Sequence, residues 1–143
     1  MKIAKVLLVD DEDGFLDVMT RRLEKRDLEI QTANSGEKAL AMLGGDHGID
    51  VVILDVKMPV MDGIQALREI KKACPLVEVV MLTGHATVET AIEGMRHGAF
   101  DYLMKPCDIE QLVRKVAEAK EKRDKHQEKI LQAQMREITG RMV

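Results

Sequence analysis

The chain has 143 residues, of which 45% are hydrophobic and 33% charged, with a formal net charge of −3 at pH 7. This length and balance indicate one globular domain with a substantial core, and no apolar run approaches the roughly 20 residues of a membrane-spanning helix. The first residues, MKIAKVLLVDDED, place acid directly after a short apolar run, which is not the pattern of a secretory signal peptide. Cys74 and Cys107 lack metal-binding spacing, so we expect reduced thiols in a cytoplasmic protein.

Charge is divided unevenly along the chain. Residues 120–143 contain seven Lys or Arg and four Asp or Glu, a net charge of +3, which leaves −6 for the rest. A helix this weakly basic is usually a solvated face. We therefore expect no nucleic-acid partner.

The first half of the chain alternates between strand-like and helix-like segments. A continuous apolar run predicts a strand over residues 4–9, and apolar residues on one helical face predict a helix over residues 15–26. An alternating pattern predicts an edge strand over residues 28–33, and Ser35 is the expected cap of a helix over residues 35–43. The apolar face of the first helix consists of Phe15, Leu16, Met19 and Leu23.

The second half continues this alternation. Apolar runs predict further strands at residues 50–55, 77–82 and 100–104. Helical spacing predicts helices over residues 63–73 and 88–95, and Asp108 is the expected cap of a last helix. Five strands alternating with five helices predict a doubly wound α/β fold with a parallel sheet. Functional residues then gather at the carboxyl ends of the strands.

Five polar residues follow four of the predicted strands and should meet at that edge: Asp10, Asp11, Asp55, Thr83 and Lys105. Carboxylates in one cleft repel each other, by roughly 4 kcal/mol for two unit charges about 4 Å apart at an effective dielectric of about 20. Either one of them is protonated or a cation neutralises the cluster. Hard oxygen ligands favour Mg²⁺, so we expect a magnesium site.

A metal ion, an ammonium group and a hydroxyl around a carboxylate are the parts of a phosphoryl-transfer site. Asp55 is the expected nucleophile, which would form an aspartyl phosphate. Lys105 would neutralise the phosphoryl oxygens, and Thr83 would donate a hydrogen bond to one of them.

Two other uses of such a fold do not match the sequence. A nucleotide site needs a glycine-rich turn after the first strand, and neither GxGxxG nor GxxxxGK[ST] occurs. A phosphatase of the haloacid dehalogenase type carries a second acid two residues after the nucleophile, where this chain has Lys57. His85 and His97 are expected at the surface rather than as phosphate carriers.

Four motifs within residues 3 to about 117 carry a family resemblance: "LLVDDE", "VILDVKMPVMDG", "MLTGHA" and "GAFDYLMKP". In order and spacing the chain resembles the receiver domain of bacterial two-component response regulators. The stretch "LTGHATVETAIEGMRHGAFDYLMKP" is most similar to the nitrogen-regulator subgroup, whose receivers usually precede a σ54-activating ATPase. The resemblance implies a flavodoxin-like sheet with strand order 2-1-3-4-5, and the sequence adds an extended C-terminal helix.

The resemblance also implies the roles of the acidic residues. Asp55 is the phosphoacceptor in this interpretation. Asp10 and Asp11 hold Mg²⁺ together with Asp55, and the backbone carbonyl of Lys57 completes the metal shell.

Other residues are implied to transmit the signal. Thr83 and Lys105 contact the phosphoryl group, and Lys105–Pro106 is a cis bond. Tyr102 is the switch aromatic, although ordinary strand packing would also account for it. The face formed by the fourth helix, fifth strand and fifth helix is where partners or a second copy dock.

The implied function is a phosphorylation-activated switch rather than an enzyme with an external product. A histidine kinase or phosphotransfer protein would supply the phosphoryl group. Two alternatives stay open: a receiver fragment of a larger σ54-dependent activator, and a phosphorylation-independent interaction module. A degenerate receiver of the second kind would lack one of Asp11, Asp55, Thr83 or Lys105, and all four are present.

The chain divides into a receiver domain, residues 1–119, and a helical extension, residues 120–143. Within the extension an apolar seam recurs at 4-3-4 spacing, formed by Leu131, Met135, Ile138 and Met142. The seam is too short for an autonomous coiled coil. It is either the stub of a linker or part of a homodimer contact.

Overall fold

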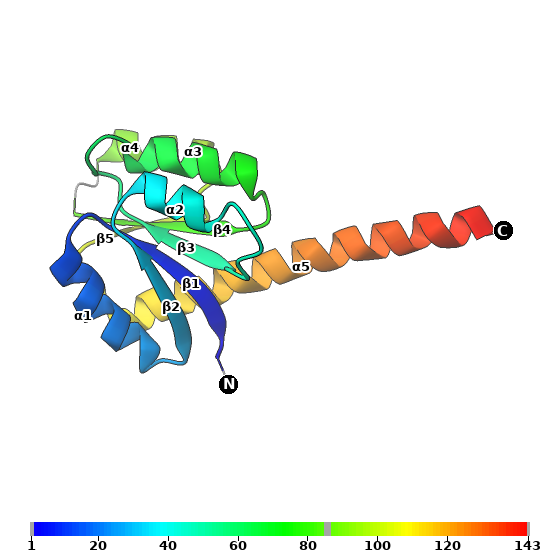
Figure 1. Cartoon of the computed structure of the whole chain (residues 1–143), viewed down its shortest axis with the longest axis horizontal. Coiled ribbons are helices and arrows are strands. Elements are labelled where there is room, and N and C mark those ends of the chain that lie inside the picture. The colour runs from blue at the N-terminus through cyan, green and yellow to red at the C-terminus, as the bar shows by residue number, and fades with distance from the viewer. Residues whose placement is uncertain (1, 85–86, 143) are drawn as a thin grey trace.

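The computed structural model describes residues 2–84 and 87–142, which form five parallel strands in the order β2-β1-β3-β4-β5 (Figure 1). The strands are β1 (Ala4–Val9), β2 (Leu28–Ala33), β3 (Val51–Leu54), β4 (Glu78–Thr83) and β5 (Asp101–Met104). The helices are α1 (Asp13–Glu24), α2 (Gly36–Met42), α3 (Gly63–Ala73), α4 (Val88–Arg96) and α5 (Ile109–Met142). The predicted fold class, strand order and extended last helix are confirmed.

Helices cover both faces of the sheet, with α1 and α5 on one side and α2, α3 and α4 on the other (Figure 1). Successive side chains of a strand point to opposite faces, so β1 contributes to two cores. Leu7 and Val9 pack toward α2 and α3, whereas Val6 and Leu8 pack toward α1 and α5. Because both faces of the central strands β1, β3 and β4 are buried, these strands are nearly continuous apolar runs.

Capping fixes the helices that begin near the carboxyl edge. The Ser35 hydroxyl accepts a hydrogen bond from the backbone N–H of Lys38 at 3.1 Å, as its predicted cap role requires. The Asp62 carboxylate does the same for Gln65 at 2.9 Å. These caps satisfy N–H groups that the first turn leaves unpaired.

Helix α4 differs from the other helices in what its apolar residues do. Their spacing identified the helix correctly, but Val88, Ile92 and Met95 are exposed. The residue that α4 buries is Gly94. The apolar face of α4 is therefore free to contact another molecule, a point that helical periodicity alone could not decide.

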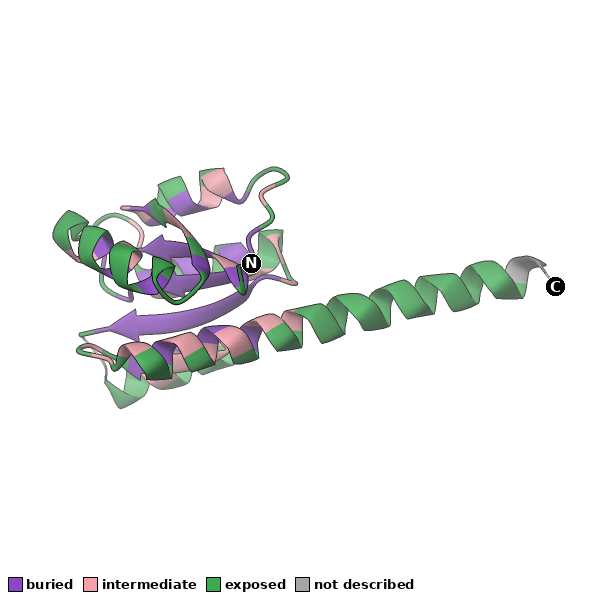
Figure 2. Ribbon diagram, turned by 90° about the horizontal axis from the view of Figure 1, so that it is seen from below, coloured by how far each residue is buried: buried purple, intermediate pink, exposed green. Residues whose placement is uncertain are grey.

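Helix α5 packs on the sheet through Leu112, Val116 and Ala119 and then runs past the domain. Two ion pairs hold it at the amino ends of the strands: Lys122 lies 3.2 Å from Glu78, and Arg123 lies 3.5 Å from Asp50. From residue 124 to residue 140 every side chain is exposed (Figure 2). Although α5 is long, none of the helices in the described ranges has an apolar stretch that could cross a membrane.

The loop between β3 and α3 contains a residue in an unfavourable backbone conformation. Val60 has φ of 68° and is 96% exposed. A β-branched side chain is crowded in this left-handed region, at a cost of roughly 1–2 kcal/mol. No burial of the side chain offsets that cost.

Replacing Val60 with Asn, which tolerates the left-handed region, should raise the free energy of unfolding by about 1 kcal/mol. Urea denaturation would measure the change. Val18→Asn is the matched control, because Val18 is also exposed but lies within α1. If Val60→Asn is no more stable than the control variant, the backbone at residue 60 stores no strain.

Candidate functional site

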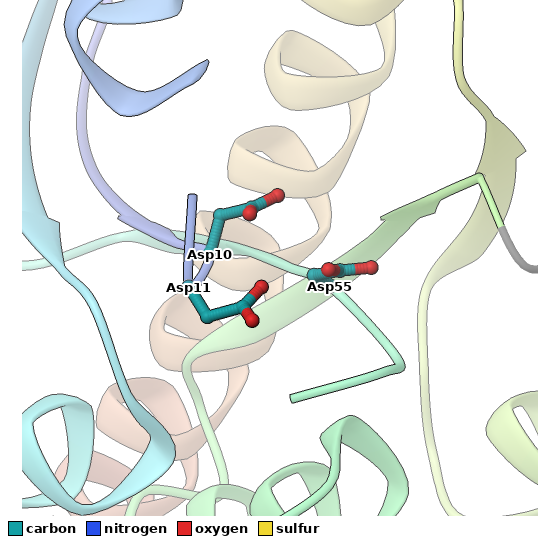
Figure 3. A group of neighbouring side chains, drawn as sticks. All are labelled: Asp10, Asp11 and Asp55. Carbon is teal, nitrogen blue, oxygen red and sulfur yellow. The ribbon is translucent and has the colours of Figure 1, made fainter. Parts of the chain in front are cut away.

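Three carboxylates meet where β1 and β3 end. Val9 and Leu54 are paired in register, so Asp10 and Asp55, which follow them, emerge side by side. Asp11 adds a third carboxylate, and one oxygen from each lies within 4.8 Å of the others (Figure 3). Asp10 and Asp55 are 1% and 4% exposed, whereas Asp11 is exposed. The cluster thus has a buried base and an open mouth.

Backbone hydrogen bonds fix the buried acids. The N–H of Asp10 donates to the carbonyl of Ala33 at 3.2 Å, and the N–H of Asp55 donates to Val9 at 3.0 Å. The Asp10 carboxylate in turn accepts a hydrogen bond from the N–H of Glu12 at 3.0 Å. The sheet therefore determines where the carboxylates lie.

Lys105 brings a positive charge to the cluster from the end of β5. Its Nζ donates to Asp10 Oδ2 at 2.5 Å and lies 4.0 Å from Asp55 Oδ2. Its backbone N–H donates to the carbonyl of Thr83 at 2.9 Å. The next peptide bond, Lys105–Pro106, is cis as predicted.

The site stays rich in negative charge despite this lysine. Burial raises the pKa of Asp10, although the hydrogen bonds from Lys105 and the Glu12 backbone and the charge of Lys105 lower it. Asp55 Oδ1 is buried and has no hydrogen-bond partner among the described residues. Three carboxylates with one ammonium group and one unpaired buried oxygen favour a further cation.

A pocket of about 410 Å³ connects the cluster to solvent. It is lined by Asp11, Glu12, Asp55, Lys57, Met58 and Pro59. Lys57 lies at its exposed rim. Glu12, Met58 and Pro59 were not among the predicted site residues, although each is a near neighbour of an acid in the quoted motifs.

Gly63 closes the loop that follows Asp55. A Cβ atom at this position would clash with the backbone oxygen of Asp55, so no side chain fits there. Its N–H donates to the carbonyl of Val56 at 2.5 Å. The loop from Asp55 to α3 therefore requires glycine here.

The other predicted residues lie on β4, on β5 and at the end of α4. Thr83 is fully buried at the end of β4. Tyr102 is half-buried on β5, where its hydroxyl lies 3.0 Å from the Thr90 hydroxyl of α4. His97, half-buried at the end of α4, lies 3.2 Å from Glu93. His85 lies outside the described residues.

The donor set fits a hard divalent cation. Carboxylate oxygens are the preferred protein ligands of Mg²⁺, which retains several waters. The unpaired oxygen of Asp55 and the exposed carboxylate of Asp11 supply such ligands on either side of an open pocket. The residues therefore match the magnesium site that the sequence predicts.

Known proteins share this architecture. Residues 6–117 match the family described as "Response regulator receiver domain". A receiver domain protein from Clostridium thermocellum is 39% identical with a TM-score of 0.78, over 90% of this chain and 98% of that chain. NtrX from Brucella abortus is 35% identical with a TM-score of 0.81, over 90% of this chain and 29% of that chain.

Curated relatives are longer proteins. Regulatory protein AtoC of Escherichia coli (strain K12) is 41% identical over 110 residues, which are 77% of this chain and 24% of AtoC. DNA-binding transcriptional regulator NtrC of Salmonella typhimurium is 37% identical over 114 residues, 80% of this chain and 24% of NtrC. The chain thus spans about a quarter of the length of these relatives.

A doubly wound sheet with an acid cluster and a lysine at its carboxyl edge defines the class of signal receiver domains. The chain belongs to the response regulator receiver domain family of two-component systems. Its similarity to NtrC and NtrX confirms the expected relation to the nitrogen-regulator subgroup.

Asp55→Asn should stabilise the metal-free protein by on the order of 1 kcal/mol, because an amide replaces a buried carboxylate beside two others. Thermal unfolding in EDTA would show a higher Tm. Asp17→Asn, at an exposed position on α1, controls for the change in net charge. A lower Tm for Asp55→Asn than for this control would contradict the repulsion argument.

Proposed function

We propose that the protein is a phosphorylation-activated switch that accepts a phosphoryl group on Asp55. A histidine kinase or phosphotransfer protein would be the donor. The observation that carries this proposal is the buried Asp55 carboxylate, with one unpaired oxygen, next to two acids and Lys105. A nucleophile that must meet a dianionic phosphoryl group needs positive charge beside it, which Lys105 and a cation held by the three carboxylates would supply.

Each site residue has a part in the transfer. Asp10, Asp11, Asp55 and the backbone carbonyl of Lys57 would hold Mg²⁺, which supplies charge neutralisation for the phosphoryl oxygens when bound. An Asp55 oxygen attacks phosphorus, the new P–O bond forms, and the bond from phosphorus to the donor nitrogen breaks.

Lys105 is placed to stabilise the product. Its ammonium group already lies between Asp10 and Asp55, so a small movement lets it pair with a phosphoryl oxygen. Water later attacks the aspartyl phosphate and releases inorganic phosphate. The protein then promotes its own phosphorylation and dephosphorylation, with no other product, and is not an enzyme in the usual sense.

Thr83 and Tyr102 would pass the change to the surface. The Thr83 hydroxyl is proposed to move toward the phosphoryl group, which opens space near β5. Tyr102 then turns inward and releases the 3.0 Å contact with Thr90 of α4. Once this contact is released, α4 would shift relative to β5. Because α4 carries an exposed apolar face, the shift would alter a surface on which partners can dock.

The proposed context follows from the family. Residues 1–119 would be the receiver domain and residues 120–143 a helical extension. Cys74 and Cys107, both in the receiver domain, are free thiols, and free thiols suit the cytoplasm. The receiver part of a longer transcriptional regulator is the second candidate, because the curated relatives are about four times as long as the matched region.

Acetyl phosphate with Mg²⁺ should add the mass of one phosphoryl group, and Asp55→Asn should abolish the addition. Lys105→Ala should slow it by roughly 10²-fold, since a preorganised charge is lost. Intact mass spectrometry measures both. Asp17→Asn should behave as the wild type. A phosphoryl group that persists in the Asp55→Asn variant would place the acceptor elsewhere.

Millimolar Mg²⁺ should raise the Tm of the wild type, because a ligand that binds only the folded state stabilises it. Asp11→Asn should remove most of this rise, since Asp11 offers a carboxylate at the open mouth of the cluster. Asp13→Asn, at a nearby exposed position, is the control. Equal shifts in all three proteins would exclude the acid cluster as the metal site.

Self-association is the remaining part of the proposal, and the structure separates its two candidate surfaces. Five turns of an α-helix contain 18 residues, so two residues 18 positions apart lie on the same side of α5. Leu131, Met135 and Ile138 therefore lie on the same side of α5 as Val113, Ala117 and Lys120. That line lies on a different side of α5 from Lys115 and Lys122, which contact Asp101 and Glu78 at β5 and β4. One straight interface cannot include both the tail seam and the α4–β5–α5 face.

We therefore assign the phosphorylation-dependent contact to the α4–β5–α5 face and treat the tail seam as a separate contact. Beryllofluoride with Mg²⁺ should increase the mean mass in light scattering, and a tenfold tighter dimer needs only about 1.4 kcal/mol. Ile92→Lys should remove this increase. Ile138→Lys should lower association equally in both states. A wild type that stays monomeric in both states would contradict self-association.

A further inference from the structure

The Lys105 ammonium group has an aromatic neighbour that the proposed mechanism does not use. Its Nζ lies 3.9 Å from the centroid of the Phe15 ring. The same atom donates to Asp10 and lies 4.0 Å from Asp55. The lysine side chain is only 18% exposed. The largely buried ammonium group of Lys105 therefore lies next to two carboxylates and to the face of an aromatic ring.

The position of Phe15 follows from the start of α1. Leu16 and Met19 are buried against the sheet, and Phe15 is half-buried at the margin of the same core. The preceding loop is held by the hydrogen bond from Glu12 to Asp10. The ring thus belongs to the same segment as Asp10 and Asp11, and this segment places it beside Lys105.

A ring holds an ammonium group differently from a carboxylate. The negative face of the ring attracts the cation without adding a charge, and the attraction grows when water is excluded. A lysine has a flexible four-carbon stem, so without the ring only Asp10 and Asp55 would keep the ammonium group in place. When Asp10 and Asp55 share their charge with a bound cation, that hold weakens. The attraction of the ring does not depend on those carboxylates.

We propose that Phe15 is a positioning residue for Lys105: its ring keeps the ammonium group over Asp55 while the carboxylates are engaged elsewhere. The ring adds no oxygen acceptor to the site, so N–H groups of the ammonium remain available for phosphoryl oxygens. This proposal rests on the proposed function of Lys105. An aliphatic residue of similar size would fill the space but would not attract the cation.

Graded fluorination of Phe15 tests the idea, because each fluorine weakens the negative ring face at nearly constant shape. The rate of phosphorylation by acetyl phosphate with Mg²⁺ should fall stepwise from no fluorine to three, to a total of about tenfold. Phe15→Leu should lose about as much, and Phe15→Trp should keep most of the rate. Melting temperatures should not follow the fluorine count, whereas a purely structural role predicts no trend in rate.

Phe100 is the matched control. It is also half-buried, and its ring centroid lies 5.7 Å from Nζ of Lys122, away from the acid cluster. The same fluorine series at Phe100 should leave the phosphorylation rate unchanged. Equal trends at both positions, or no trend at Phe15, would overturn the proposal.

A second measurement is independent of phosphorylation. The ring current of Phe15 should shift the ε-methylene protons of Lys105 upfield in the NMR spectrum, and Phe15→Leu should abolish the shift. The shift should persist when Mg²⁺ is added, because the ring then still holds the ammonium group. Loss of the shift with Mg²⁺ would refute the positioning role. A wild type that accepts no phosphoryl group would instead refute the proposed function, and the NMR result would still decide the contact.

Discussion

The ion pair between Lys105 and Asp10 is the interaction on which the site depends. It joins residues 95 positions apart, and β3 and β4 lie between the strands that carry them. A buried carboxylate without a partner costs several kcal/mol. The fold must therefore place the end of β5 where Lys105 can reach Asp10 at the end of β1. The bond from Lys105 to the Thr83 carbonyl and the ring of Phe15 both support that reach. Parallel topology brings these parts to one edge.

Much of this arrangement was predictable from local patterns. Continuous apolar runs identified the strands, and the placement of acids and a lysine directly after them identified the edge where they meet. The outward face of α4 was not predictable, because spacing shows that apolar residues share a face but not which way it points. The contact of Phe15 with Lys105 was also out of reach. It depends on how a helix start and a strand end pack across the sheet, which no short motif encodes.

The two ends of the sheet differ in how far their buried carboxylates are paired with positive charges. At the amino end, Glu78 is buried between Lys71 and Lys122, both 3.2 Å away, so its charge is balanced within the domain. At the carboxyl end, three carboxylates share one lysine. At the carboxyl end a pocket opens beside Asp55, whereas at the amino end Glu78 contacts Lys122 of α5. The excess of negative charge is therefore a local property of the carboxyl end of the sheet.

The balanced end also determines what α5 can do mechanically. The ion pairs of Lys122 and Arg123 form a pivot, and about 28 Å of helix extends from Arg123 to Met142 at 1.5 Å per residue. For a straight helix of that length, a tilt of about 10° at the pivot moves the far end by about 5 Å. The extension would thus convert a small tilt of α5 against the sheet into a larger movement far from the domain.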